Sequence, residues 1–308
     1  MRRCPPALAE PHTAIYDWRP YRGFHILRVF AGALRIAGDP DDRVEDILRR
    51  IPPSVDTFVF NLDLSYTVRF PQERERLVSE LRARGIDVWN ANATDMRKSR
   101  MQQVCRNTGL PSVSTTRDGD PDEILIVKSD ANYAGKAERT LSARQRERLG
   151  IPGAVRMFAT KDEYRVVRRR EVLPEWWENP LLEVERFVSN AENLWYRVRF
   201  ICDTWVVSET ISLSPIKTIE NASSERSHIF RRGEAVDLPD RLQEVSGRLI
   251  DMLELEYGAL DVIVDDGGEM YVVDVNATPG LTVYAEGQLE AFRQAWQERR
   301  MSRRLTTI

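Results

Sequence analysis

One segment near the carboxyl end limits most strongly what this chain can fold into. It runs from Tyr257 to Gly280 and reads YGALDVIVDDGGEMYVVDVNATPG. Its first half is apolar and β-branched apart from one Asp, Asp265–Gly268 has the composition of a tight turn, and a second strand-like run follows. The segment therefore predicts a β-hairpin, in which we expect Val264 to pair with Glu269 across the turn.

Three oxygen-bearing side chains fall on one face of this predicted hairpin. In the expected register Asp261 lies opposite Val272. Because residues i and i+2 share a face of a strand, Asp274, which is diagonal to Asp261, lies on the same face as Asn276. Two carboxylates and an amide oxygen are hard ligands that suit Mg²⁺, which usually takes one or two carboxylates together with substrate phosphates. The alternative is a surface hairpin with ordinary acidic residues, although Asp and Asn are depleted inside strands.

The composition restricts the class of protein. With 308 residues, of which 42% are hydrophobic, the chain can form one large domain or two to three small ones with real cores. A net charge of −3 gives no bulk electrostatic case for a nucleic-acid partner. Basic residues nevertheless cluster at 168–170, 231–232 and 299–304. We expect the last of these clusters to be a solvated face.

The cysteines and the start of the chain argue against a secreted or membrane protein. Cys4, Cys105 and Cys202 are far apart, so neither a disulfide framework nor a zinc site is expected. The first residues, MRRCPPALAEP, carry positive charge but no apolar stretch of signal-peptide length. No apolar run reaches the length of a membrane-spanning helix. We therefore expect a cytoplasmic protein without a membrane partner.

Periodicity divides the chain into three units, which we place at residues 1–90, 91–180 and 181–308. The first unit has a loose leader and then strand-like and helix-like runs in alternation, which predicts a small parallel sheet. Glycine is expected to end its charged helix at residue 85 and the first helix of the second unit at residue 109. The expected elements are an apolar segment at 24–30, strands at 57–61, 86–89, 124–127 and 181–188, a turn at 176–180, a strand pair at 196–201 and 205–212, and helices at 71–84, 94–108, 239–256 and 288–299.

A lysine at a strand end suggests a phosphate contact in the second unit. Lys128 ends the strand ILIVK and precedes the loop Ser129–Lys136, which contains Gly135. A lysine beside flexible backbone can meet a phosphate as a point charge while the N–H groups of the loop surround the anion. The alternative is an edge lysine with an ordinary surface loop.

Taken together, these segments resemble the ATP-grasp enzymes, which include D-alanine–D-alanine ligases and ribosomal-protein glutamate ligases. Those enzymes have an Asp and, one hairpin later, Glu-x-Asn-x-x-Pro-Gly. Asp274 replaces the usual Glu with a side chain one methylene shorter, which leaves open whether one or two metal ions bind. The motif stands here as Asp261, Asp274, Asn276, Pro279 and Gly280.

The resemblance covers roughly 90–287 and implies a fold class of α/β and α+β units. Residues 1–90 would form an N-terminal α/β domain that precedes the ATP-grasp fold. Residues 91–180 would form the central ATP-grasp subdomain. Residues 181–308 would form the C-terminal subdomain with the metal-binding hairpin and a terminal helix.

The resemblance also implies nucleotide contacts. Two lysines match those that the family directs at ATP phosphates, and the loop after the second matches the mobile loop that covers the β- and γ-phosphates. The segment LLEVERFV at 181–188 resembles the strand that gives backbone groups to adenine, with a carboxylate nearby for ribose, although it can also be a mixed edge strand. The implied residues are Lys98, Lys128, Gly135, Glu185, Arg186, Phe187 and Glu192, with Glu185 and Glu192 as alternatives for ribose, and Lys136 as a weaker phosphate candidate.

Three basic residues are implied for catalysis. Arg197 stands in a segment that resembles the Asp-x-Arg-x-x-Val hairpin of the glutamate ligases, although that Asp is absent here. D-alanine–D-alanine ligases place an Arg two residues before the first metal Asp, where this chain has Ala259, so we assign stabilisation of the transferring phosphate or acylphosphate to Arg197. A cross-strand ion pair is the alternative. Lys217 and Arg226, which aligns with a Phe-Arg-Ser-Asn segment, are candidates for nucleotide or acylphosphate contacts.

The implied reaction activates a carboxylate as an acylphosphate, which an amine then attacks, with release of ADP and phosphate. Catalysis of such phosphoryl transfer depends more on positioning and charge neutralisation than on acid–base chemistry by side chains. We expect a carboxylate–amine ligase that uses ATP and Mg²⁺, with Mn²⁺ as an option, and acts on small-molecule or peptide substrates. An ATP-grasp kinase and a nucleotide-binding regulator without turnover are the alternatives, and homodimer formation stays open.

Overall fold

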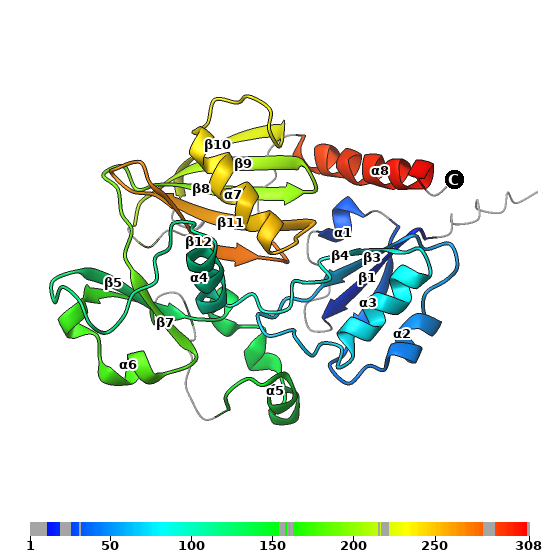
Figure 1. Cartoon of the computed structure of the whole chain (residues 1–308), viewed down its shortest axis with the longest axis horizontal. Coiled ribbons are helices and arrows are strands. Elements are labelled where there is room, and N and C mark those ends of the chain that lie inside the picture. Colours follow the sequence, from blue (N-terminus) through cyan, green and yellow to red (C-terminus); the bar gives the residue numbers. More distant parts are fainter. Residues whose placement is uncertain are drawn as a thin grey trace, which may run out of the picture.

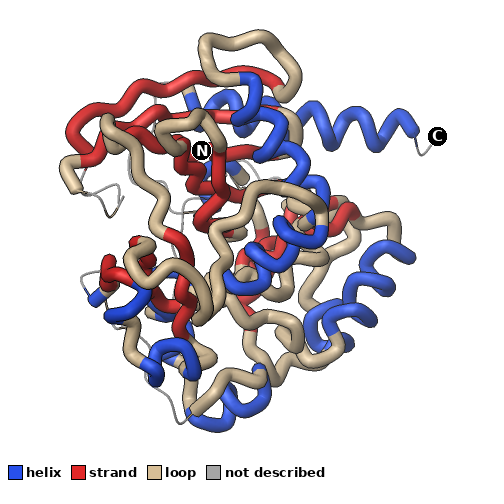
Figure 2. Tube along the Cα trace, turned by 60° about the vertical axis from the view of Figure 1, so that its left-hand side comes forward, coloured by secondary structure: helices blue, strands red, loops and turns tan. Residues whose placement is uncertain are grey.

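Within the part of the chain that the structure describes, the β-strands form three sheets (Figure 1). The structure is a computed structural model. Figure 2 shows the strands of these sheets as separate groups joined by long loops. The described residues are 11–18, 26–30, 32–153, 158, 160, 163–214, 216, 222–279 and 287–306.

The first sheet confirms the parallel sheet predicted for the amino-terminal unit. Its strand order is β2-β1-β3-β4, and all pairs are parallel. The residues of β1 and β3 are buried throughout, as expected for parallel strands covered on both faces. The strands β1 and β2 had no counterpart in the prediction. The elements are β1 (Thr13–Trp18), α1 (Ile26–Val29), β2 (Leu34–Gly38), α2 (Val44–Arg49), β3 (Thr57–Asn61), α3 (Arg74–Ala83) and β4 (Asp87–Trp89).

The second sheet is small and antiparallel, with the order β6-β5-β7. The turn expected at 176–180 is instead mostly a short helix, which starts with Pro174 at its first position, where a missing N–H costs nothing. A capping box between Ser142 and Gln145 starts another helix, which Gly150 ends in a left-handed conformation. The elements are β5 (Ile124–Ser129), α5 (Ala143–Leu149), β6 (Arg165–Arg168), α6 (Pro174–Glu178) and β7 (Leu182–Arg186).

The third sheet is antiparallel, with the order β10-β9-β8-β11-β12. Two helices, α4 and α7, pack with it around one apolar core that includes Met101, Leu249 and Leu260. The division predicted at residue 180 therefore does not coincide with the division between the second and third sheets. Helix α4 precedes residue 180 but packs on the third sheet, whereas β7 follows residue 180 and belongs to the second sheet. The elements are α4 (Lys98–Asn107), β8 (Leu194–Ile201), β9 (Thr204–Ser212), β10 (Ala222–Arg231), α7 (Asp240–Met252), β11 (Tyr257–Val264) and β12 (Met270–Asn276).

The hairpin of β11 and β12 forms, but the predicted register is wrong. Val264 pairs with Met270, because Glu269 closes the turn by accepting a backbone hydrogen bond from Asp265 (2.9 Å). An irregularity after Asp261 then adds one more unpaired residue, as a β-bulge does. Asp261 consequently lies directly opposite Asp274 rather than diagonal to it.

The last helix, α8 (Gln288–Thr306), packs against the first unit. The ring of its Trp296 lies 5.2 Å from that of Phe30, in an edge-to-face contact. Arg299 and Arg300 form ion pairs of 2.9 Å each with Asp87 and Asp56. The basic cluster predicted to be a solvated face is therefore partly an interface with the first unit. Among the described residues, no helix combines the length and the apolar character that crossing a membrane requires.

Asn90 joins the first sheet to the third. It is fully buried and adopts a left-handed φ of 54°, which Asn tolerates better than most residues. Its side-chain nitrogen donates to the Tyr257 carbonyl (3.0 Å), and its side-chain oxygen accepts from the Glu256 N–H (3.0 Å). One side chain thus satisfies backbone groups at the start of β11.

We predict that Asn90→Ala lowers the free energy of unfolding by about 2–4 kcal/mol. The substitution leaves buried backbone groups without partners and places a residue without a polar side chain in the left-handed region. Urea unfolding measures the change. Asn107→Ala, on the exposed side of α4, is the control and should change stability by less than about 0.5 kcal/mol. Equal effects of the two substitutions would contradict this role of Asn90.

Candidate functional site

A pocket of about 790 Å³, open to solvent, lies between the second and third sheets. Side chains from α4, β5, β7, β11 and β12 line it, so segments far apart in the sequence meet there. The predicted site residues that line the pocket are Lys98, Lys128, Glu185, Arg186, Phe187, Asp261 and Asp274.

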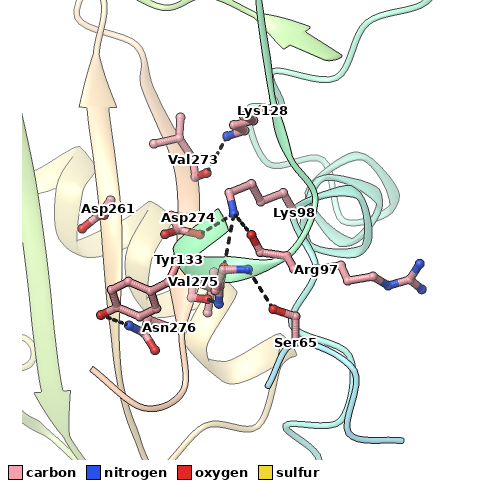
Figure 3. Close-up of polar contacts among 12 residues, drawn as sticks. Ser65, Arg97, Lys98, Lys128, Tyr133, Asp261, Val273, Asp274, Val275 and Asn276 are labelled. Carbon is pink, nitrogen blue, oxygen red and sulfur yellow. Dashed lines mark hydrogen bonds and ion pairs between the residues drawn. The ribbon is translucent and has the colours of Figure 1, made fainter. Parts of the chain in front are cut away.

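Lys98, the first residue of α4, points at the hairpin of β11 and β12 (Figure 3). Its ammonium nitrogen lies 3.5 Å from the Asp274 Oδ1. The same nitrogen donates to the Ala131 carbonyl at 3.1 Å and to the Asn132 Oδ1 at 3.4 Å. The lysine is therefore buried between the loop after β5 and the carboxylate of β12, with its charge at the pocket.

Lys128 lines the pocket and forms an ion pair with Glu185. Its ammonium nitrogen lies 2.6 Å from the Glu185 Oε2. The same nitrogen donates to the Val273 carbonyl at 3.0 Å (Figure 3). Burial raises the pKa of Glu185, and the Lys128 ammonium opposes that rise. Burial, followed by repulsion from Glu185, also raises the pKa of Glu183 to about 8. Glu185 thus acts as the partner of Lys128 in this structure.

The positions of Glu185 and Glu192 do not decide which of them would contact the ribose. Glu185 is committed to Lys128. Glu192 is exposed, and it is not among the described residues that line the pocket. The identity of the ribose contact stays a prediction.

The two carboxylates of the hairpin are each matched by a cation. Asp261 faces Asp274 across β11 and β12, and its Oδ1 lies 3.2 Å from the Arg197 Nη1 on the other neighbouring strand. Burial lowers the pKa of Arg197, but Asp261, Tyr133 and Asp274 together more than offset this, so the pKa is raised overall. The cross-strand ion pair considered as the alternative for Arg197 is therefore present, and it places the guanidinium beside the predicted metal site.

Asn276 lies in the third predicted ligand position, on the same strand as Asp274, but its amide oxygen is used elsewhere. That oxygen accepts the Thr278 N–H at 2.9 Å, while the amide nitrogen donates to the Tyr133 hydroxyl at 2.9 Å (Figure 3). Tyr133, Ala134 and Gly135 have left-handed φ values of 49°, 54° and 65°. Metal coordination by Asn276 would therefore compete with the Thr278 contacts for the lone pairs of the amide oxygen.

The donor set nevertheless fits Mg²⁺. Two facing carboxylates and an adjacent amide provide hard oxygen ligands, and Mg²⁺ commonly needs only one or two carboxylates beside phosphates and water. Among the described residues, no group of three His, Cys, Asp or Glu side chains is arranged to hold a metal ion. Asp261 and Asp274 with Asn276 would therefore hold Mg²⁺ only with further oxygens from a ligand or solvent.

One of the predicted catalytic residues is not brought to this pocket. Arg226, on β10, is exposed and pairs with Asp237 at 3.1 Å, and it does not line the pocket. Lys217 and the motif residue Gly280 lie outside the described residues. Arg197 is therefore the member of the catalytic set that the structure places at the hairpin.

Sequence reasoning missed Arg199. It follows Arg197 by two residues on β8, so both lie on one face of the strand, and it pairs in register with Ala259. Ala259 stands where the D-alanine–D-alanine ligases have an Arg, so Arg199 offers a cation on the neighbouring strand at that position. The Arg-x-Arg spacing was the available signal in the sequence. It points to a site only once Arg199 is known to be buried, with a side chain that is 3% exposed.

Comparison with known proteins identifies the fold. No family model matches the sequence, and no curated protein matches it significantly. The structure of D-alanine–D-alanine ligase from Bacillus anthracis matches with 14% identity and a TM-score of 0.51, covering 94% of this chain and 95% of that one. The ATP-grasp ligase PsnB, complexed with a minimal precursor, matches with 14% identity and a TM-score of 0.49, covering 92% and 99%. D-cycloserine synthetase DcsG matches with 14% identity and a TM-score of 0.49, covering 93% and 99%. The chain has the ATP-grasp fold, with an α/β domain before it.

We predict that Asp274→Asn removes most of the dependence of nucleotide binding on Mg²⁺. Calorimetry with a non-hydrolysable ATP analogue should show at least a tenfold loss of affinity with Mg²⁺ and little loss without it, because the variant lacks one ligand charge. The matched control is Asp266→Asn, in the turn of the same hairpin, which should behave as the wild type. An unchanged Mg²⁺ dependence in Asp274→Asn would contradict the metal assignment.

We predict that Lys98→Ala and Lys128→Ala each weaken ATP binding by roughly ten- to a hundred-fold, since a hydrogen bond to a charged group contributes about 1.5–3 kcal/mol. Arg100→Ala removes a cation from the exposed side of the same helix as Lys98 and should have little effect. Because Lys128→Ala leaves Glu185 buried and unpaired, the double variant Lys128→Ala/Glu185→Gln tests the same point in a folded protein. Wild-type affinity in Lys98→Ala and in that double variant would reject the phosphate role.

Proposed function

We propose that this protein is an ATP- and Mg²⁺-dependent carboxylate–amine ligase. The observation that carries the proposal is the meeting of Lys98 and Lys128 with the facing carboxylates of Asp261 and Asp274 in one pocket. Such a set offers cations for a polyphosphate and ligands for its metal ion side by side. The substrates are a carboxylate and an amine, which are small molecules or part of a peptide, and we place the reaction in the cytoplasm.

The nucleotide would lie along the pocket with its phosphates at the two lysines. Its base would lie at the end of β7, near Phe187 and between apolar side chains such as Ile126 and Ile263. The Phe187 N–H already donates to the Ile124 carbonyl at 3.0 Å. Contacts to the base would therefore come from Val188 and from carbonyl groups of this segment.

The reaction requires cations that now pair with protein carboxylates to contact the phosphates of the ligand instead. Bound Mg²⁺ would neutralise phosphate charge and orient the phosphates. With Asp261 and Asp274 committed to the metal ion, the guanidinium of Arg197 and the ammonium of Lys98 become available to the transferring phosphoryl group. A substrate carboxylate oxygen attacks the γ-phosphorus, ADP leaves, and the amine then displaces phosphate from the acylphosphate to give an amide.

Trapping with hydroxylamine tests the proposal. The purified protein is incubated with ATP, Mg²⁺, hydroxylamine and pools of carboxylic acids, and hydroxamates are measured by mass spectrometry together with the nucleotide products. A hydroxamate formed with one equivalent of ADP is the expected result. AMP and pyrophosphate would indicate adenylation and contradict the proposal. A phosphate ester that hydroxylamine does not cleave would identify a kinase instead, and nucleotide binding without any product would identify a regulator.

A further inference from the structure

Arg199 is a buried cation that no described carboxylate pairs with at ion-pair distance. Its side chain lies on β8 beside Arg197, which is already occupied by Asp261 at 3.2 Å. Burial, followed by repulsion from Arg197, lowers the pKa of Arg199 to about 10, so the guanidinium is still charged at neutral pH. Burying a charge is unfavourable unless an opposite charge or strong hydrogen bonds compensate it. The position therefore calls for an anion.

The partners that Arg199 does have are neutral hydroxyl groups. Its Nη1 donates to the Ser208 Oγ at 2.8 Å, and the Ser208 Oγ lies 3.1 Å from the Ser227 Oγ. Its Nε, also buried, has no hydrogen-bond partner among the described residues. Ser227 lies on the edge strand β10 and is exposed, so this row of polar groups runs from the interior to the surface across β8, β9 and β10.

The row lies on the opposite side of Asp261 from the proposed phosphate site. In the order β10-β9-β8-β11-β12, Lys98 and Lys128 contact groups of β12, whereas Arg199 and the two serines lie on β8, β9 and β10. A nucleotide held by the lysines therefore leaves the Arg199 side to the other substrate. Residues two apart on a strand are separated by about 7 Å, which is the spacing of Arg197 and Arg199 along β8. Ser208 on β9 lies directly opposite Arg197.

We propose that Arg199, Ser208 and Ser227 form a subsite for a second anionic group on the carboxylate substrate. This inference rests on the proposed function and deepens it, because it names the substrate class as a short dicarboxylate. One carboxylate lies at Arg197 and the metal carboxylates, where it is activated. The other accepts hydrogen bonds from the Arg199 guanidinium and the two hydroxyl groups. It places a carboxylate in direct contact with a cation that Glu225 and Asp261 influence only from beyond ion-pair distance.

Pairs of acids with equal chain length test the subsite. Calorimetry is carried out on the full protein with ADP and Mg²⁺ present, using succinate against butanoate, glutarate against pentanoate and adipate against hexanoate. In the wild type, at least one diacid should bind roughly ten- to a hundred-fold more tightly than its monoacid, which is the effect expected for a charged hydrogen bond. Equal affinity within all three pairs, absence of binding included, overturns the proposal.

Variants separate recognition from a structural role. Arg199→Met should reduce the diacid affinity to that of the monoacid, Arg199→Lys should retain part of the difference, and the exposed Ser227→Ala should lower it several-fold even if Arg199→Met does not fold. A merely structural role would lower thermal stability and leave the ratio of diacid to monoacid affinity unchanged. Nucleotide affinity is measured in parallel. If the wild type does not bind the nucleotide, the proposed function has failed rather than the subsite.

Discussion

Two carboxylates face each other at directly opposed positions of β11 and β12, and the arrangement of the site depends on this contact. Like charges in that position repel and destabilise a strand pair. The structure compensates them with Lys98 on one side of the hairpin and Arg197 on the other. Because these cations come from α4 and β8, the repulsion between Asp261 and Asp274 is balanced only when segments far apart in the sequence pack together.

The same balance explains how the site could change its state. The ion pairs Lys98–Asp274, Arg197–Asp261 and Lys128–Glu185 neutralise the pocket from within. A divalent cation between the two Asp residues would take over the compensation on the hairpin, and phosphates would take over the lysines. The same side chains compensate the carboxylates now and would contact the ligands later, so such an exchange couples metal binding to nucleotide binding.

The sequence predicted best the features that depend on neighbours in the chain. The hairpin turn at Asp265–Gly268 and a strand that ends close to Lys128 both follow from local patterns. The bulge after Asp261 was not predictable, because the extra residue is recorded only in the hydrogen bonds between strands. Arg199 was overlooked for a related reason, since its meaning comes from burial and from its neighbours on β9 and β10.

Other elements show where tertiary contacts outweigh local pattern. The basic end of α8 reads as a solvated face, yet Arg299 and Arg300 find acidic partners on the first unit that no local pattern indicates. Arg226 matched a motif by its spacing, but it lies at an exposed ion pair with Asp237. A motif residue can therefore occupy the expected strand without reaching the pocket.

A co-crystal structure with Mg²⁺ and a non-hydrolysable ATP analogue tests the exchange of partners most directly. We expect a metal ion with Asp261 and Asp274 oxygens at about 2.0–2.1 Å, the typical distance for Mg²⁺. We also expect the ammonium groups of Lys98 and Lys128 to lie at phosphate oxygens. A nucleotide bound elsewhere, or bound here with the Lys98–Asp274 and Arg197–Asp261 ion pairs intact and no metal between the carboxylates, would contradict this exchange of partners.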